Sequence, residues 1–213
     1  PAEGVIGLLP AGTANVVAKE LGIPLNLREA AKLLLTGTVQ RLDTGRMNGR
    51  RFLMSAGFGF DAHVAGHVPA RSKRLLGQYA FHLETALRYP FYRPPTLRVR
   101  VDGAEWRTGA YLLCANLRRY GGNLFFAPAA RPDDGVINLV LFESLSLRPL
   151  LKGLWGAKTG RGPPPDAACR ATGRRIEIEC PEPVGVQLDG EVLPAVTRAV
   201  VEAGRADLAM VVP

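Results

Sequence analysis

The spacing of apolar positions changes along the chain, and the change divides it into two parts. A continuous apolar run over residues 5–9 is typical of a strand buried on both faces of a parallel sheet. Apolar residues at helical spacing then predict helices over residues 14–21 and 27–35, and a second short strand is expected over 39–42. Strands that alternate with helices predict an α/β fold for this first part.

After about Gly45 the pattern becomes that of short strands. Asn48-Gly49, Asp102-Gly103 and Asp189-Gly190 are dipeptides that favour two-residue β-hairpin turns. Strands are expected over 97–101, 111–116, 136–142, 176–180 and 184–188, interrupted by helices over 75–89 and 147–158. This spacing predicts an antiparallel sandwich or an open barrel.

Composition and charge narrow the classes of protein. The 213 residues are 47% hydrophobic and 22% charged, which is ordinary for a globular chain, and no apolar run is long enough for a transmembrane helix. The formal net charge of +8 suits a phosphate or an anionic membrane. Aromatic residues do not interleave with the basic ones, so we expect no nucleic-acid partner. Three cysteines without a CxxC pair predict neither a disulfide framework nor a zinc site.

The beginning of the chain is a further observation. Its first residues run directly into the strand pattern, with no signal peptide before it. We therefore expect the chain to have been cut from a longer protein.

The turn Gly12-Thr13-Ala14-Asn15 lies between a predicted strand and a predicted helix. Backbone N–H groups at such a turn suit a phosphate, and the side chains of Thr13 and Asn15 can add donors. The alternative is that Thr13 or Asn15 only caps the helix.

Carboxylates follow or precede predicted strands at three places. Asp43 ends a strand where the two parts meet, a position at which open α/β sheets bind ligands, and it can hold magnesium. Asp133-Asp134-Gly135 suits a hard cation. In Asp189-Gly190-Glu191 one carboxylate can act as a general base on an alcohol while the other binds magnesium. For all three segments, a simple turn is the alternative explanation.

Taken in order, these segments resemble the diacylglycerol kinase catalytic domain of bacterial lipid kinases, a family that also includes sphingosine kinases. The resemblance rests on the ordered set of motifs, each of which is weak alone. They are residues 6–15 with Leu21-Gly22-Ile23-Pro24, Leu42-Asp43-Thr44-Gly45, residues 52–61, Tyr120-Gly121-Gly122-Asn123, Ala127-Pro128, Asp133-Asp134-Gly135 and Gln187-Leu188-Asp189-Gly190-Glu191.

The resemblance implies a fold of class α/β plus all-β. Residues 1–45 would be the C-terminal part of an α/β nucleotide-binding domain similar to that of NAD kinase. Residues 46–204 would form an antiparallel β-sandwich domain for substrate and metal, and residues 205–213 would return to the first domain. The active site would lie between them.

The resemblance also implies cofactors and roles. ATP phosphates would lie near Gly12, Thr13 and Asn15, and Asp43 would belong to the acidic network around a catalytic Mg²⁺. Asp189 would be the base that takes the proton from the lipid hydroxyl, with Glu191 beside it in the metal network. Asp134 would help to hold a second metal ion.

Two departures from the family pattern qualify this prediction. The family's glycine-rich Gly-Gly-Asp-Gly-Thr loop, which grips ATP, does not occur in the sequence, and Val16 stands where many members carry Asp. We expect an ATP-dependent lipid kinase acting on diacylglycerol or a related lipid at a membrane surface, cytoplasmic and peripheral, with little activity in this chain alone. A homodimer is a further expectation. The alternatives are a sphingoid-base kinase and a non-catalytic lipid-binding module of the same fold.

Overall fold

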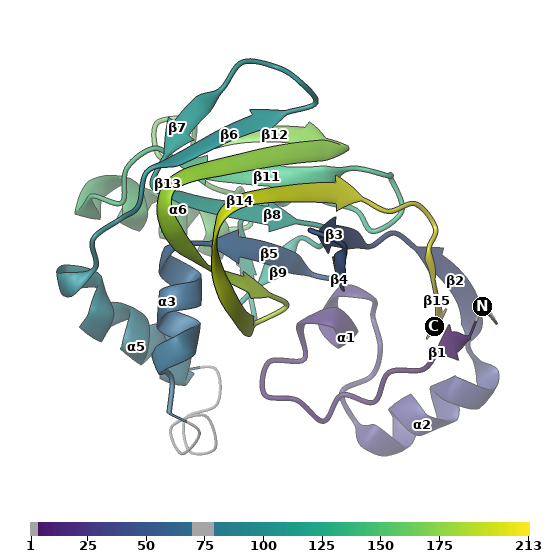
Figure 1. Ribbon diagram of the computed structural model, residues 1–213. Coiled ribbons are helices and arrows are strands. Elements are labelled where there is room, and N and C mark those ends of the chain that lie inside the picture. Colours follow the sequence, from purple (N-terminus) through teal and green to yellow (C-terminus); the bar gives the residue numbers. More distant parts are fainter. Residues whose placement is uncertain (1–3, 70–78) are drawn as a thin grey trace.

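The structure, a computed structural model, describes residues 4–69 and 79–213 (Figure 1). Its first part holds a small sheet with two helices beside it. Strand β15 (Leu208–Val212) lies between β1 (Val5–Ile6), to which it is parallel, and β2 (Thr38–Leu42), to which it is antiparallel. Helices α1 (Val16–Glu20) and α2 (Leu27–Thr36) complete this part. The last strand therefore pairs with strands from the first 42 residues.

The prediction for residues 5–9 was wrong in extent and in burial. Only Val5 and Ile6 form a strand, and their side chains are 51% and 45% exposed. The physical reason is that β1 is an edge strand, with β15 as its one neighbour among the described residues. The two predicted helices and the strand over 39–42 are confirmed.

The second part is an antiparallel sheet of ten strands within the described residues. Its hairpin turns at residues 48–49, 102–103 and 189–190 have positive φ at both positions, as the predicted dipeptides require. The strands are β3 (Gly45–Met47), β4 (Arg50–Phe52), β5 (Ser55–Phe58), β6 (Leu97–Val101), β7 (Arg107–Gly109), β8 (Tyr111–Ala115), β11 (Ile137–Phe142), β12 (Cys169–Gly173), β13 (Arg175–Leu188) and β14 (Glu191–Ala203).

Strand β13 bends and joins two layers of this sheet. Its first half pairs with β6 through residues 176–179, and its second half pairs with β5 through residues 186–188. The register of its pairing with β14 shifts between Glu179 and Val184, where Pro181 and Pro183 cannot donate ladder hydrogen bonds. The two strands expected over 176–180 and 184–188 are therefore one bent strand. The main apolar core lies between the layers, which confirms the α/β plus all-β fold class with a sandwich.

Helices cover the outer face of the β5–β8–β11 layer (Figure 1). They are α3 (Phe60–His67), α5 (Tyr79–Arg88), the 3₁₀ helix η1 (Tyr89–Phe91) and α6 (Leu147–Lys158), together with the short hairpin of β9 (Arg119–Tyr120) and β10 (Leu124–Phe125). Of the helix predicted over 75–89, residues 75–78 lie outside the described residues. None of the helices that the structure describes is long and apolar enough to cross a membrane.

Candidate functional site

Asp43 ties three segments together at the junction between β2 and β3. Its side chain is 3% exposed. One carboxylate oxygen accepts a hydrogen bond from Gly135 N–H and the other from Ala206 N–H, both at 2.6 Å. The Asp43 N–H itself donates to the Pro132 carbonyl at 2.6 Å. The predicted ligand-binding carboxylate is therefore a structural joint, with both oxygens already bonded to backbone.

The neighbouring Thr44 extends this joint to Asp207. Thr44 donates from its N–H (3.0 Å) and its hydroxyl (2.9 Å) to Asp207 Oδ1, while Arg46 and Arg51 form ion pairs with Oδ2 at 3.0 and 3.4 Å. Partial burial raises the pKa of Asp207, but the bonds from Arg46 and Thr44 outweigh it and hold that pKa below its usual value. The connection between β14 and β15 is thus fixed to the start of the large sheet.

Asp189 lies at the tip of the β13–β14 hairpin, with φ of 51°. Its Oδ2 accepts from Leu53 N–H at 2.7 Å, and its Oδ1 accepts from the N–H groups of Met54 (2.7 Å) and Ser55 (2.9 Å). Three donors on one carboxylate fix the hairpin tip against the beginning of β5. Residue 191 differs, because Glu191 is exposed and its side chain has no hydrogen bond or ion pair in the described part of the chain.

Asn116 connects the Asp43 and Asp189 regions, and the sequence did not point to it. Its fully buried side chain donates from Nδ2 to the carbonyls of Asp43 and Leu53, both at 2.9 Å. Leu53 also donates its N–H to Asp189. Asn116 and Leu53 together thus link Asp43 to Asp189. The only sequence signal was a polar residue at the end of the apolar strand β8.

Replacing Asn116 by alanine should therefore destabilise the chain strongly. The change leaves the buried Asp43 carbonyl and the partly buried Leu53 carbonyl without this donor, and we expect a loss of about 2–4 kcal/mol in the free energy of unfolding. Urea denaturation measures it. Asn123→Ala removes an exposed amide that bonds only Arg119 among the described residues, and should change stability by less than about 0.5 kcal/mol. Equal effects of the two variants would contradict the bridging role.

A second buried network reaches the hairpin from the outer face of the sheet. Gln187, 2% exposed, donates from Nε2 to Asp61 Oδ2 at 2.9 Å, and its Oε1 accepts from Gly190 N–H at 2.6 Å. Tyr120 donates its hydroxyl to the same Asp61 oxygen at 2.8 Å. A Cβ at position 57 would overlap this carboxylate, so Gly57 is required there. The orientation of the Gln187 amide, and with it the hairpin tip, is set by Asp61.

The charge state of Asp61 should make stability depend on pH. Burial raises the pKa of Asp61, although the bonds from Tyr120 and Gln187 oppose this effect. Because the folded pKa exceeds the unfolded one, the protonated form favours folding, and stability is lost as pH rises through the folded pKa. Urea denaturation from about pH 4 to about pH 8 should show this loss relative to Asp61→Asn, by about 1.4 kcal/mol for each pH unit that separates the folded pKa from the unfolded pKa. A difference that stays constant with pH would contradict it.

The Gly12–Asn15 turn does not cap α1. Asn15 has φ of 47° and makes no side-chain cap bond, and its Oδ1 instead accepts from Gly12 N–H at 2.9 Å. Helix α1 has only five residues, so its N-terminus alone makes no anion site. Thr13 is exposed and has no partner in the described residues. Val16, at the position where the resemblance leads us to expect Asp in many members, is buried, with 8% of its surface exposed.

The predicted metal residues do not converge. Asp134 is exposed, and its pKa is raised by partial burial and by repulsion from Asp43 and Asp133. It precedes Gly135, whose N–H bonds Asp43. No interaction joins Glu191 to either residue, and no group of three potential metal ligands occurs within residues 4–69 and 79–213. With both Asp43 oxygens engaged, these side chains do not form a ready magnesium centre. Their metal role stays a prediction.

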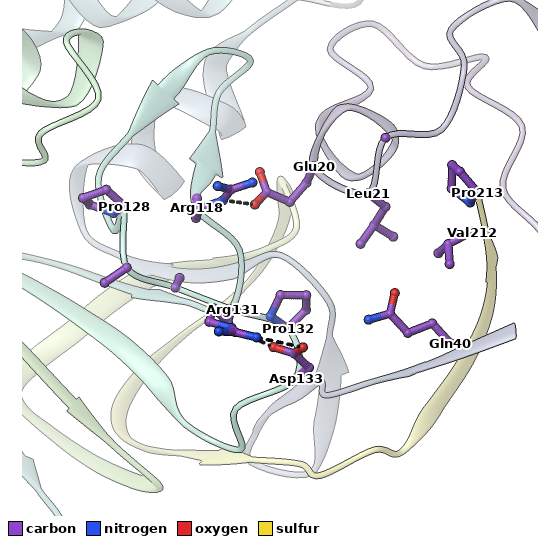
Figure 2. Close-up of a pocket in the computed structure, with 13 residues that line it drawn as sticks. Glu20, Leu21, Gln40, Arg118, Pro128, Arg131, Pro132, Asp133, Val212 and Pro213 are labelled. Atoms are coloured by element: carbon purple, nitrogen blue, oxygen red, sulfur yellow. Dashed lines mark hydrogen bonds and ion pairs between the residues drawn. The ribbon is translucent and has the colours of Figure 1, made fainter. Parts of the chain in front are cut away.

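A pocket lies beside the predicted cation segment, with Pro132 and Asp133 in its lining (Figure 2). It has a volume of about 790 Å³ and lies between the end of α1, the strands β2 and β15, and the loop over 128–133. Its charged side chains are already paired, Arg118 with Glu20 at 2.6 Å and Arg131 with Asp133 at 3.1 Å. None of the predicted catalytic or nucleotide residues lines it.

Comparison with known proteins decides the family. The family model described as the YegS C-terminal NAD kinase beta sandwich-like domain matches residues 54–211, and that of the diacylglycerol kinase catalytic domain matches residues 2–47. The chain belongs to the diacylglycerol kinase and YegS lipid kinase family. The resemblance seen in the ordered motifs is thereby confirmed.

Relatives within this lipid kinase family are longer than the chain. The diacylglycerol kinase of Bacillus subtilis (strain 168) is 28% identical over 87% of this chain and 62% of its own length. "Probable lipid kinase YegS" of Salmonella paratyphi A is 30% identical over 88% of this chain and 62% of its own. A crystal structure of a Bacillus anthracis str. Sterne protein, named as a candidate diacylglycerol kinase, has a TM-score of 0.77 at 24% identity over 96% of this chain and 68% of that chain. This last likeness supports the fold.

Proposed function

We propose that the chain is the larger part of a lipid kinase that transfers the γ-phosphoryl group of ATP to the hydroxyl of diacylglycerol or a related lipid. The observation that carries the proposal is the match to both family models, in chain order, across the carboxylates Asp43, Asp134, Asp189 and Glu191. Phosphoryl transfer needs mainly positioning and neutralisation of charge, which a rigid hairpin tip can supply.

In this proposal Asp189 is the general base and Glu191 lies beside it. The three backbone donors fix Asp189 in one orientation, so its remaining lone pairs point in constant directions. Asn116 supports the Leu53 peptide that holds it, and Gln187 supports the hairpin from the other side. These two amides are positioning residues.

ATP is proposed to enter as its magnesium complex, with its phosphates near Gly12, Thr13 and Asn15. The exposed Thr13 hydroxyl is available as a donor, whereas Gly12 N–H already bonds Asn15. No step is assigned to a resident metal ion, because Asp43, Asp134 and Glu191 do not converge. Since the family's glycine-rich ATP loop does not occur in the sequence, we propose that this chain alone has little activity. The acceptor lipid would be met at the cytoplasmic surface of a membrane, and a homodimer stays a prediction.

One set of observations favours a second candidate, a non-catalytic lipid-binding module. All four carboxylate oxygens of Asp43 and Asp189 accept backbone hydrogen bonds, and Val16 removes one acidic residue. A lipid-binding module in which Asp43 and Asp189 only hold the fold together would have the same hydrogen bonds at these positions.

A phosphotransfer assay separates the two candidates. The parent kinase, by which we mean the longer protein of which this chain is proposed to be the larger part, would be incubated with radiolabelled ATP and magnesium. Micelles would supply diacylglycerol, monoacylglycerol, ceramide or sphingosine, and the lipid products would be separated by chromatography. Labelled phosphatidic acid supports the proposal, and labelled sphingosine phosphate moves the activity to a sphingoid-base kinase. If the folded protein produces no labelled lipid, that result supports the binding module.

A further inference from the structure

Helix α6 packs its small residues inward and its large apolar residues outward. Gly153, Gly156 and Ala157 are buried, and a Cβ at Gly153 would lie 2.5 Å from the ring of Phe142. The opposite face carries Leu147, Leu151 and Trp155, which are 58%, 55% and 69% exposed. Their spacing of four residues places them in one stripe along the helix. A helix that only covered a sheet would not need this outer stripe.

The stripe lies among basic side chains. Helix α6 contains Arg148, Lys152 and Lys158 and no acidic residue, and Arg161 follows it. The nearby acids in the chain are Glu143 and Asp166, of which Asp166 pairs with Lys152. The segment from 143 to 166 therefore carries an excess of positive charge beside its apolar stripe.

Two further exposed apolar side chains lie on α5 and η1. Phe91, in η1, is 87% exposed, and Leu87 in the preceding helix is 56% exposed. The Tyr89 hydroxyl donates to the Leu145 carbonyl at 2.8 Å, which joins η1 to the residue two positions before α6. Helices α5 and α6 both lie at the left of Figure 1. The neighbouring Tyr92 packs inward against Phe60.

We propose that the α6 stripe docks on an anionic lipid surface, with the exposed Phe91 as a second apolar contact. Amphipathic helices with a basic flank lie in the plane of a membrane interface, and tryptophan is enriched at that depth. The excess of positive charge complements an anionic leaflet. This inference rests on the proposed lipid kinase function, since it places the chain where its acceptor lipid lies.

The fluorescence of Trp155 can show directly whether the stripe enters a lipid surface. The chain has two tryptophans, and Trp106→Phe, which replaces an indole lying under Arg98 and Arg100, leaves Trp155 as the only one. Phosphatidylcholine vesicles with and without phosphatidylglycerol would be added, without ATP or acceptor lipid. We expect the Trp155 emission to shift to the blue and to be protected from aqueous quenchers only with phosphatidylglycerol.

Vesicle sedimentation tests the stripe itself. Changing Leu147, Leu151 and Trp155 together to serine should weaken binding at least about tenfold. The matched control is Leu35→Ser, which alters an apolar side chain that is 89% exposed on α2, and it should bind as the wild type does. Arg148→Glu with Lys158→Glu should also weaken binding to anionic vesicles.

Three results would contradict the proposal that the α6 stripe docks on lipid. They are the absence of vesicle binding, vesicle binding that leaves Trp155 unchanged, and a concentration-dependent blue shift without vesicles, which would indicate a second copy on the stripe. Because no step of the test uses ATP, an inactive parent kinase whose α6 stripe still binds vesicles would contradict the proposed kinase and leave the docking face intact.

Discussion

Replacing Asp189 by asparagine in the parent kinase is expected to lower lipid phosphorylation by about 10²–10⁴-fold, the usual contribution of a general base. Asparagine keeps one oxygen that can accept the N–H groups of Met54 and Ser55, so most of the contacts of the hairpin tip survive. The initial rate of label transfer to lipid measures the effect, with thermal unfolding as a check on folding.

Two variants of the same hairpin are the controls for Asp189→Asn. Gln187→Ala removes the bond to Gly190 but leaves both carboxylates, and should cost only about tenfold through looser positioning. Glu191→Gln removes the carboxylate that has no partner in the described residues. If Asp189→Asn kept wild-type activity while Glu191→Gln lost it, the base would be Glu191 and not Asp189.

Replacing Asp43 by alanine is expected to destabilise the chain by about 3–5 kcal/mol. The change leaves the N–H groups of Gly135, in a buried hydrogen bond, and of Ala206, in a partly buried one, without their charged acceptor. Urea denaturation measures the loss. Asp133→Ala removes an exposed carboxylate that pairs only with Arg131 in the described chain, and should cost less than about 1 kcal/mol.

A loss of stability below about 1 kcal/mol for Asp43→Ala would contradict the structural role of Asp43. The result also decides how activity data should be interpreted. If the alanine variant is as unstable as expected, its loss of activity cannot by itself assign Asp43 to an acidic network around magnesium. Asp43→Asn, which retains one acceptor oxygen, would then be the better variant for kinetics.

The sequence predicted the helices and hairpin turns, because residues close together in the chain determine them. Helices α1 and α2 and the hairpins at Asn48-Gly49 and Asp189-Gly190 follow from apolar spacing and from residues that tolerate positive φ. The exposed edge strand β1 and the bent strand β13 did not follow, because each depends on which strand lies beside it. The long strand β14 was missed for the same reason.

The candidate site shows the same limit. Asp43 and Asp189 stood out because of their position in ordered motifs, but their hydrogen-bond partners are far away in the chain. Gly135 is 92 residues from Asp43, and Met54 is 135 residues from Asp189. Asn116 had no motif of its own, so its bridge between the two regions could be seen only in the fold.

The stoichiometry of the reaction tests the lipid kinase proposal most directly. ADP and phosphorylated lipid would be quantified in parallel for the parent kinase, with acceptor lipid present and absent. The account predicts equal amounts of the two products, formed only when lipid is present. ADP formed without lipid, or lipid that binds without any ADP being formed, would contradict it.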